Sequence, residues 1–457
     1  MKCNAFINRE KELKILEEAW RKRPILIIVY GRRRTGKTRL IREFLRKHKH
    51  VYYLAQQASH EYNLNKLALR MSEYLGKKYF AEARYHGIDV LLKAFVDSGG
   101  DDTVVVIDEF TYWVRSAPLV LGELQRYVDT ELPSTRIMLV LMGSLIGTME
   151  THVLGYRSPL YGRSRYRLRI NAFRYPQLKY FVPRYNSINR VIVYSLFGGL
   201  PYYLCMIDDS EDLYHNIRKL MLEPGAPMLL EKELILREEL RDPHVYNAIL
   251  SSIAKGYNRP SLIADATGID KSHVSKYLSV LTSLGIVKRE VPLFSKRGYY
   301  RIVDPILRTW FSLLEPISEL IDLELVDEAL EYIGKKIPAH VAGVWEDLVR
   351  EYLLTRYAVQ GYSKAGKLVH KGEEIDVVVL NEDNREAVLG EAKWSTLPVK
   401  DIERIRRKLL EKASRLLPRG YTVREAFIAV KEVKDSIRKP DWILTPADLE
   451  KAYQPIL

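Results

Sequence analysis

A short apolar run followed at once by a glycine-containing loop is the feature that most limits how this 457-residue chain folds. The run Ile25–Tyr30 is β-branched and continuously apolar, as expected of a parallel strand buried on both faces. The loop that follows reads Gly31-Arg32-Arg33-Arg34-Thr35-Gly36-Lys37-Thr38. In such a loop the glycines let backbone N–H groups curl around phosphates, the lysine reaches the β- and γ-phosphates, and the final threonine binds Mg²⁺ at the start of a helix. The segment therefore predicts an α/β fold with a P-loop that binds ATP and Mg²⁺.

Two more apolar runs end in polar residues that belong beside such a loop. Val104–Ile107 leads into Asp108 and Glu109, an acid pair expected to organise Mg²⁺ and to activate the attacking water. Ile137–Met142 leads towards Ser144, which we expect to sense the γ-phosphate because ligands bind at the carboxyl ends of parallel strands. The acid pair predicts ATP hydrolysis as well as ATP binding.

Arginines alternate with other residues from Arg163 to Ile170, so they share one face of a predicted strand. Arg163 is the one expected to reach the γ-phosphate. For Arg165, Arg167 and Arg169 a solvated strand face is the favoured interpretation.

Four segments resemble the archaeal ATPase family, within the broader signal-transduction and AAA-like P-loop NTPases. They are Phe6–Leu13, the loop GRRRTGKT, the strand VVVIDEF, and residues 197–204, which read FGGLPYYL. The resemblance implies that Phe6 and Arg9 lie near the adenine and that the G-G-x-P stretch starts a helical lid. An apolar ring with a few polar groups is what a base pocket requires.

Composition bears on partners and compartment. The chain has 72 Lys and Arg against 58 Asp and Glu, a net charge of +14, which favours polyanions such as DNA. A heat-adapted, charge-rich surface is the alternative explanation for the net charge.

Two isolated thiols, Cys3 and Cys205, fit a reducing cytoplasm. The longest apolar run, Ile137–Gly147, is interrupted and too short for a membrane span, so a soluble protein without membrane contact is expected.

Between Asp242 and Val303, three short helical patterns precede two strand patterns. Val274, Leu278 and Leu281 recur at helical spacing and point inward. The outward residues of this helix and the basic turn between the strands are the predicted DNA contacts: Ser272, His273, Ser275, Lys276, Lys296 and Arg297. The order predicts a winged helix-turn-helix whose second helix enters the DNA major groove. Use as a packing module or a protein dock is the alternative.

A helical connector at Ile317–Ile333 and a break at Lys335–Pro338 precede the last predicted domain. After a helix at Val341–Arg356, two adjacent strands carry Asp376 on one and Glu391 with Lys393 on the other, and strand alternation places Glu391 and Lys393 on one face. Two carboxylates suit a hard divalent cation, and Lys393 is expected to orient or deprotonate an attacking water. Such a site hydrolyses phosphodiesters.

This arrangement resembles the PD-(D/E)xK nuclease superfamily, although Ile375 stands where the motif has proline. The resemblance implies a restriction-endonuclease-like α/β domain, in which Glu346 matches the acid often found on the first helix. The alternative is a strand hairpin that happens to carry acids and a lysine.

The predicted domain order is a P-loop ATPase domain at 1–197, a helical lid at 198–241, the winged helix at 242–305, a helical connector at 306–340 and the nuclease-like domain at 341–457. The predicted function is ATP turnover that controls a DNA-binding module and a Mg²⁺-dependent nuclease centre. The alternative is a regulatory ATPase switch that binds DNA or protein without cutting, with the formation of a homo-oligomer on ATP binding left open. A helicase or translocase is not predicted, because the sequence shows no second P-loop and no extra motor motif.

Overall fold

The computed structural model describes residues 6–240, 242–435 and 439–452, and it divides into two compact units. The first unit extends to Ala172 and includes Leu200–Tyr202, whereas the second contains Phe173–Gly199 and the chain from Tyr203 onward. The first unit thus ends before the boundary predicted at residue 197, because helix α9 (Ser187–Phe197) packs against helices of the second unit.

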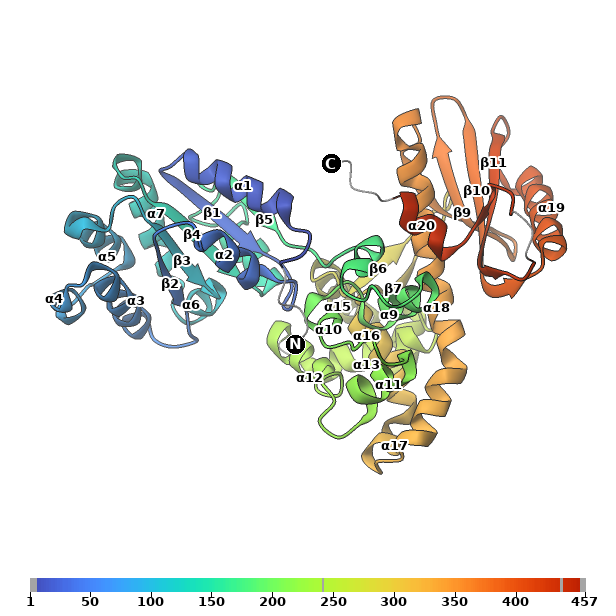
Figure 1. Cartoon of the computed structure of the whole chain (residues 1–457), viewed down its shortest axis with the longest axis horizontal. Coiled ribbons are helices and arrows are strands. Elements are labelled where there is room, and N and C mark those ends of the chain that lie inside the picture. Colours follow the sequence, from blue (N-terminus) through green and yellow to red (C-terminus); the bar gives the residue numbers. More distant parts are fainter. Residues whose placement is uncertain (1–5, 241, 436–438, 453–457) are drawn as a thin grey trace. The chain divides into compact units, whose positions relative to one another are not determined.

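The first unit is built on a five-stranded sheet in the order β2-β3-β4-β1-β5, in which every neighbouring pair is parallel. Its strands are β1 (Ile25–Tyr30), β2 (His50–Leu54), β3 (Val104–Asp108), β4 (Met138–Gly143) and β5 (Tyr166–Arg169). The three predicted apolar runs are the three central strands, which confirms those strand predictions. All five carboxyl ends lie at one edge of the sheet, where the loop at Gly31 also begins (Figure 1).

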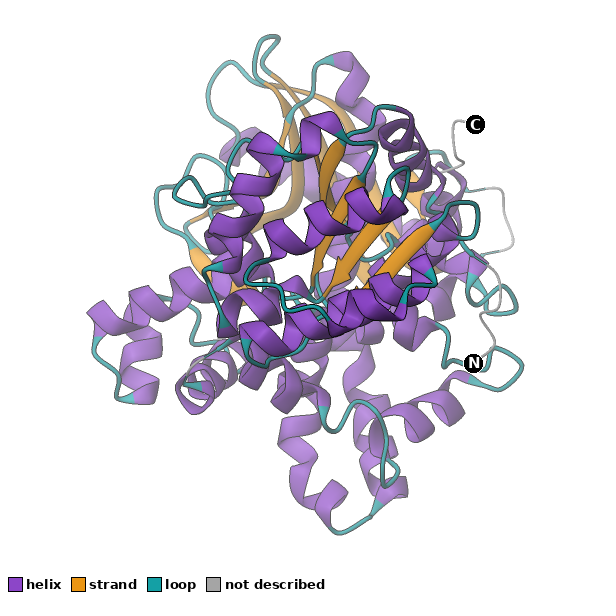
Figure 2. Ribbon diagram, turned by 90° about the vertical axis from the view of Figure 1, so that its left-hand side faces the viewer, coloured by secondary structure: helices purple, strands orange, loops and turns teal. Residues whose placement is uncertain are grey.

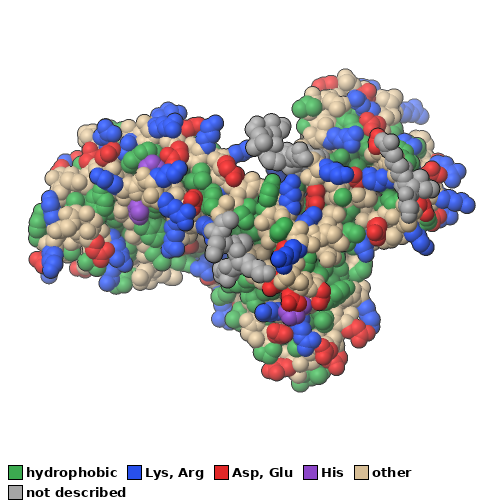
Figure 3. Space-filling model, viewed as in Figure 1, with side chains coloured by type: hydrophobic (Ala, Val, Ile, Leu, Met, Phe, Trp, Pro, Cys, Tyr) green, Lys and Arg blue, Asp and Glu red, His purple; other side chains and the backbone are tan. Residues whose placement is uncertain are grey.

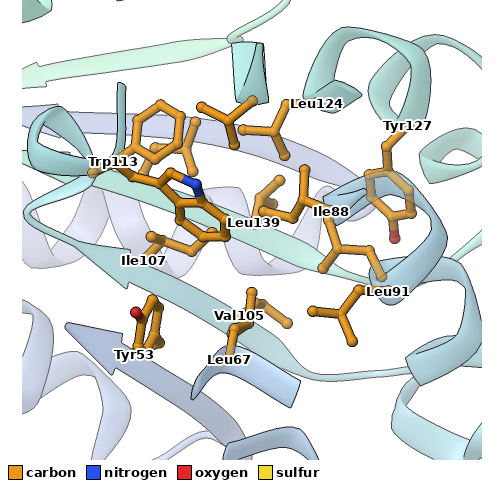
Figure 4. Close-up of a cluster of buried hydrophobic side chains, with 14 of the residues drawn as sticks. Tyr53, Leu67, Ile88, Leu91, Val105, Ile107, Trp113, Leu124, Tyr127 and Leu139 are labelled. Atoms are coloured by element: carbon orange, nitrogen blue, oxygen red, sulfur yellow. The ribbon is translucent and has the colours of Figure 1, made fainter. Parts of the chain in front are cut away.

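Helices cover both faces of this sheet, as Figures 1 and 2 show. They are α1 (Glu10–Arg21), α2 (Lys37–Leu45), α3 (His60–Leu75), α4 (Lys78–Glu82), α5 (Ile88–Phe95), α6 (Phe110–Ser116), α7 (Val120–Thr130) and α8 (Ile146–Thr148). Alternate strand residues point to opposite faces, so the sheet contributes to two separate apolar cores. Helices α1 and α2 close one core, and α3, α5, α6 and α7 close the other, where Trp113 and Tyr127 are fully buried (Figure 4).

The second unit begins with a helical region. After α9 follow α10 (Pro201–Leu204), which spans the division between the units, then α11 (Leu213–Ile217), α12 (Glu231–Glu239), α13 (Pro243–Ala254), α14 (Pro260–Thr267), α15 (Lys271–Ser283), the strands β6 (Val287–Glu290) and β7 (Tyr299–Ile302), α16 (Pro305–Thr309) and α17 (Ser318–Asp322). Strands β6 and β7 pair as an antiparallel hairpin, and α13 to α15 share an apolar core with it. Three helices and a hairpin therefore stand where the sequence predicts them. Cys3 lies outside the described residues, and Cys205, expected to be an isolated thiol, is disulfide-bonded.

A second five-stranded sheet follows, in the order β12-β11-β10-β9-β8. Its strands are β8 (Lys364–His370), β9 (Glu373–Asn381), β10 (Glu386–Leu397), β11 (Thr422–Val433) and β12 (Ile443–Leu444). The pairs β8–β9 and β9–β10 are antiparallel, and the pairs β10–β11 and β11–β12 are parallel. Helices α18 (Val326–Tyr357) and α19 (Val399–Leu416) pack on this sheet, and α20 (Pro446–Ala452) lies near its β11 strand (Figure 1).

Helix α18 is continuous through Pro338, so the predicted break at Lys335–Pro338 is wrong. Proline inside a helix removes one backbone hydrogen bond and costs about 3 kcal/mol. Buried residues on both sides of it, from Ala329 and Ile333 to Val341 and Trp345, keep the helix packed through the proline. Tertiary packing here overrides a local helix breaker.

Within the described ranges, no helix combines the length and the apolar character that crossing a membrane requires.

Candidate functional site

The loop between β1 and α2 has the backbone that a phosphate cradle needs. Gly31 and Gly36 have φ values of 149° and 89°. At Gly31 a Cβ atom would lie 2.3 Å from the carbonyl oxygen of Ile170, so only glycine fits there. The ammonium of Lys37 donates to the carbonyl oxygens of Gly31 at 2.7 Å and Arg32 at 2.9 Å, which holds the loop closed around it.

Asp108 ends β3 directly beside the start of α2. The hydroxyl of Thr38 donates to its Oδ2 at 3.1 Å, and the hydroxyl of Tyr52 on β2 donates to the same oxygen. The N–H of Glu109 donates to Oδ1 at 2.8 Å. Burial, followed by the negative charge of Asp108, raises the pKa of Tyr52, so its hydroxyl stays protonated as a donor. The structure therefore brings Thr38 and Asp108 together as predicted. Tyr52 also belongs to this group, and no sequence motif identifies it.

Glu109 lies next to Ser144, at the carboxyl ends of β3 and β4. Both the hydroxyl and the backbone N–H of Ser144 donate to Glu109 Oε2, at 2.6 Å and 3.2 Å. Glu109 itself has a φ of 51°, in the left-handed region that non-glycine residues rarely adopt. Such strain gathers at functional sites, where surrounding contacts hold it in place.

Arg9, the residue before α1, contacts the backbone of the loop. Arg9 is buried, and its guanidinium donates to the carbonyl oxygen of Thr35 at 3.2 Å and to that of Asn171 at 2.5 Å. Phe6 packs against the apolar core that α1 and α2 close. Arg9 therefore positions the loop backbone, and a place for Phe6 and Arg9 at the adenine stays a prediction.

Two arginines of the loop contact aromatic residues. Arg33 donates to the hydroxyl of Tyr112 at 2.6 Å, and the guanidinium of Arg34 lies 3.9 Å from the ring centroid of Tyr202. Tyr112 is in α6, the helix that follows Glu109. The loop is thus connected to the segment that carries the acid pair and to the short Leu200–Tyr202 segment of the same unit.

Arg163 is not at this site. It precedes β5, whose residues Tyr166–Arg169 pair in parallel with Ile27–Tyr30, so it lies at the amino edge of the sheet, opposite the loop. Its guanidinium forms a two-bond ion pair with Asp129, at 2.7 Å and 2.8 Å. Contrary to the prediction, the structure does not bring Arg163 to the γ-phosphate position of its own chain.

A second polar cluster lies in the second unit, on strands β9 and β10, next to the last residues that pair these strands. Asp376 and Glu391 are 3% and 6% exposed, and Asp376 Oδ2 accepts a hydrogen bond from the N–H of Ala392 at 2.9 Å. The ammonium of Lys393 lies 2.9 Å from Glu391 Oε1 and 3.5 Å from Asp376 Oδ2. Glu391 Oε2 is buried without a hydrogen-bond partner. The three predicted residues therefore meet, and one carboxylate oxygen is left for a further ligand. We call Asp376, Glu391 and Lys393 the acidic centre.

The electrostatics of the acidic centre change one predicted role. Burial lowers the pKa of Lys393, but the nearby charges and hydrogen bonds of Asp376 and Glu391 outweigh it and raise that pKa above its usual value. Lys393 is therefore an ammonium at neutral pH, which suits it to orient a substrate or water and not to deprotonate one.

Glu346 is held differently from the prediction. Its Oε2 lies 2.6 Å from the ammonium of Lys367, and burial, ahead of the charges around it, raises its pKa. Among the described residues, no three or more His, Cys, Asp or Glu side chains form a group that could hold a metal ion. A cation at the acidic centre would therefore be held by Asp376 and Glu391, and Glu346 would not be one of its ligands.

The predicted DNA contacts lie on one surface of α15 and in the following hairpin. Val274, Leu278 and Leu281 are buried, as predicted. Six residues are exposed: Ser272, His273, Ser275, Lys276, Lys296 and Arg297. Asp270 caps the helix by accepting from the N–H of Ser272 at 2.7 Å.

The hairpin is attached to the C-terminal sheet. The N–H of Leu293 donates to the carbonyl oxygen of Lys367 on β8 at 2.7 Å, and Leu293 belongs to the apolar core of that sheet. Arg301 on β7 forms an ion pair with Asp347 on α18 at 2.6 Å. The α13–α15 region and the acidic centre are therefore joined by contacts within one unit.

Comparison with known proteins identifies the first of these sites. Residues 6–207 match a family described as an ATPase domain predominantly from Archaea, and this range contains the loop at 31–38, Asp108, Glu109 and Ser144. Residues 6–207 are thus a P-loop ATPase domain of this predominantly archaeal family. The ATPase family implies that the domain binds a nucleotide.

The matched range of the ATPase domain continues past Ala172 into the second unit. Within that unit, residues 310–405 match a family described as Archaea bacterial proteins of unknown function. The range includes Asp376, Glu391 and Lys393 and ends inside α19.

Two relatives come from Methanocaldococcus jannaschii. The uncharacterized protein MJECL04 is 29% identical over 417 residues, which covers 89% of this chain and 92% of that protein. The uncharacterized ATP-binding protein MJ0423 is 53% identical over 45 residues, 10% of this chain and 76% of that protein. Among solved structures, the Walker-type ATPase PABY2304 of Pyrococcus abyssi is 21% identical with a TM-score of 0.49, and the alignment covers 67% of this chain and 96% of that one.

Proposed function

We propose that this protein is an ATP-hydrolysing enzyme that acts on DNA. In this proposal the ATPase domain turns over ATP, the α13–α15 region with its hairpin is a winged helix that binds DNA, and the acidic centre cleaves a phosphodiester. The observation that carries the DNA-acting part is the pair of buried carboxylates, Asp376 and Glu391, with one Glu391 oxygen lacking a partner.

In the ATPase domain, Lys37 and the loop N–H groups bind the β- and γ-phosphates of ATP. Thr38 and Asp108 supply adjacent oxygens of the kind Mg²⁺ prefers, which supports their role as its holders. When bound, Mg²⁺ neutralises the charge that develops on the phosphate oxygens. Glu109, oriented by Ser144, accepts the proton of the attacking water.

The acidic centre supports hydrolysis of a phosphodiester by its donor set. A carboxylate oxygen buried without a partner costs free energy, and a divalent cation would remove that cost. Asp376 and Glu391 would hold the cation, which would polarise the phosphate. Lys393, as an ammonium, donates to a phosphate oxygen or to the attacking water.

Coupling between DNA binding and cleavage is supported by the contacts of the hairpin. Leu293 and Arg301 fix the hairpin to the sheet and helix that carry the acidic centre. DNA held on α15 would therefore keep a defined position relative to Asp376 and Glu391.

The test is a cleavage assay. Plasmid and linear DNA are incubated with Mg²⁺ or Mn²⁺, with and without ATP, using the parent protein, Asp376→Ala and Lys37→Ala. We expect cutting by the parent, none by Asp376→Ala, and cutting by Lys37→Ala that no longer responds to ATP. Cleavage that persists in Asp376→Ala would come from a contaminant and would exclude the acidic centre as a nuclease.

A regulatory ATPase switch that binds DNA or protein without cutting is the second candidate. The ion pairs of Lys393 with both carboxylates favour it, because they satisfy part of the charge that a cation would otherwise neutralise. DNA binding by a parent protein that never cuts, whatever the cation, would select this candidate.

A further inference from the structure

Helix α19 carries more charge than any packing role requires. Its sequence, VKDIERIRRKLLEKASRL, has seven Lys and Arg against three Asp and Glu. The apolar side, with Ile402, Leu409 and Ala413, is buried against the C-terminal sheet. A basic amphipathic helix also suits a membrane surface, but this apolar side is already covered by the protein itself. The exposed basic side therefore points to a polyanion as its partner.

Four of the basic residues form a row on one side of α19. Arg404, Lys408, Lys412 and Arg415 follow one another at intervals of four, four and three residues, which places them on one side of a helix. At a rise of 1.5 Å per residue, the row is about 16 Å long, which corresponds to roughly five nucleotides at about 3.4 Å per nucleotide along one strand of duplex DNA. Figure 3 shows Lys and Arg side chains over the part of the molecule that carries α19.

This row leads to the acidic centre. The ammonium of Lys412 lies 3.7 Å from Glu391 Oε1 and donates to the carbonyl oxygen of Glu374 at 3.2 Å. Arg415 pairs with Glu373, at the start of β9, at 2.6 Å. One end of the row therefore lies beside Asp376 and Glu391, and the other extends towards Arg404.

The charges of the row are available to a ligand. The side chains of Arg404 and Arg415 are 64% and 54% exposed. Arg404 pairs with Asp401 on the same helix, and Arg415 pairs with Glu373 on β9; both carboxylates are themselves partly exposed. Solvent-exposed ion pairs of this kind contribute little to stability, so phosphates can replace the carboxylates at small cost. Lys408 is exposed and forms no ion pair with any described residue.

We propose that Arg404, Lys408, Lys412 and Arg415 bind the phosphate backbone of DNA and guide it into the acidic centre. This row is separate from α15 and from the basic hairpin, so the protein contacts DNA at two places within its second unit. The inference rests on the proposed function, in which this unit acts on DNA.

The test compares two neighbouring lysine and arginine positions on the same helix. Lys408 lies in the row, and Arg407 is exposed but turned by about 100° around the helix axis. Lys408→Ala and Arg407→Ala each remove one charge from a solvent-exposed position. Binding of full-length protein to a fluorescently labelled DNA duplex is measured by anisotropy at several salt concentrations, with EDTA present so that no cleavage occurs.

The logarithm of the DNA affinity falls linearly with the logarithm of the salt concentration, and each lost phosphate contact makes this negative slope less steep by about 0.9. We expect this decrease in steepness for Lys408→Ala and a further decrease of the same size when Arg404→Ala is added to it. For Arg407→Ala we expect the parental slope. Equal slopes for Lys408→Ala and Arg407→Ala would overturn the inference, since the effect would then be one of net charge.

The same measurements distinguish failure of this inference from failure of the proposed function. If the parent binds no DNA, the DNA-acting proposal falls together with this inference. If the parent binds and cuts DNA but Lys408→Ala keeps the parental slope, only the role of α19 is lost.

Discussion

Ser144 donates both its hydroxyl and its backbone N–H to one carboxylate oxygen of Glu109, at 2.6 Å and 3.2 Å. The two residues directly follow the neighbouring strands β3 and β4 of the ATPase domain, and Glu109 takes a left-handed backbone conformation there. Ser144 therefore acts on Glu109 directly in this structure, whereas the sequence assigned it to the γ-phosphate. The contact gives Ser144 a positioning role for the group proposed to accept the proton of water.

Replacing Ser144 by alanine tests this role. A hydrogen bond to a charged group contributes about 1.5–3 kcal/mol, so Ser144→Ala should lower kcat for ATP hydrolysis about tenfold to a hundredfold. Affinity for ATP should stay close to that of the parent, because Lys37 and the loop are unchanged. Steady-state turnover and equilibrium nucleotide binding measure the two effects. A kcat equal to the parental value would show that Glu109 needs no such positioning.

Gly31 offers a test of the loop backbone. Gly31→Ala places a Cβ atom 2.3 Å from the carbonyl oxygen of Ile170, at a φ of 149°. A strained backbone position costs about 1–3 kcal/mol, and the clash adds to it, so the ATPase domain should unfold at a lower denaturant concentration. Gly122→Ala in α7 is the control, since nothing lies within 4 Å of a Cβ there. It should raise stability by about 0.5–1 kcal/mol, and equal behaviour of the two variants would refute the assignment.

His340 predicts a pH dependence for the second unit. Burial, followed by the charge of Arg308, lowers its pKa to about 3, and its ring contacts the carbonyl oxygen of Ser195 at 3.0 Å and the hydroxyl of Ser312 at 2.9 Å. Because the folded pKa is depressed, the unfolded chain binds a proton first as the pH falls. The stabilising contribution is complete above about pH 6.5 and is lost progressively down to about pH 3.

Calorimetry between neutral and acidic pH measures this effect on the melting of the second unit. In His340→Gln the decrease in Tm on acidification should be smaller than in the parent. The same change at the exposed His86 is the control and should leave the profile unchanged. An identical pH profile in His340→Gln and the parent would contradict the prediction.

The sequence was most informative where a local pattern sets the structure directly. The loop directly follows Ile25–Tyr30, and the Asp108–Glu109 pair directly follows the run Val104–Ile107. Neighbouring parallel strands bring such strand ends together without further information. The same holds for Glu391 and Lys393, which strand alternation places on one face. Tyr52 and Lys412 approach these sites from other elements, and no local pattern reports such contacts.

The predictions that were wrong depended on long-range packing. Arg163 stands at the amino edge of the sheet because β5 pairs in parallel beside β1, and a pattern of arginines does not report where a strand is paired. Pro338 was expected to break a helix, but buried residues on both sides hold α18 together. Glu346 was assigned to a cation by resemblance, whereas Lys367, from β8, pairs with it.

The most direct test of the account uses Glu109→Gln, which keeps the shape of the side chain and removes its negative charge. ATP binding and ATP turnover are measured for this variant, for Lys37→Ala and for the parent. The account predicts that Glu109→Gln binds ATP as tightly as the parent but hydrolyses it at least about a hundredfold more slowly, and that Lys37→Ala loses binding. Parental turnover in Glu109→Gln, or undiminished ATP binding by Lys37→Ala, would contradict it.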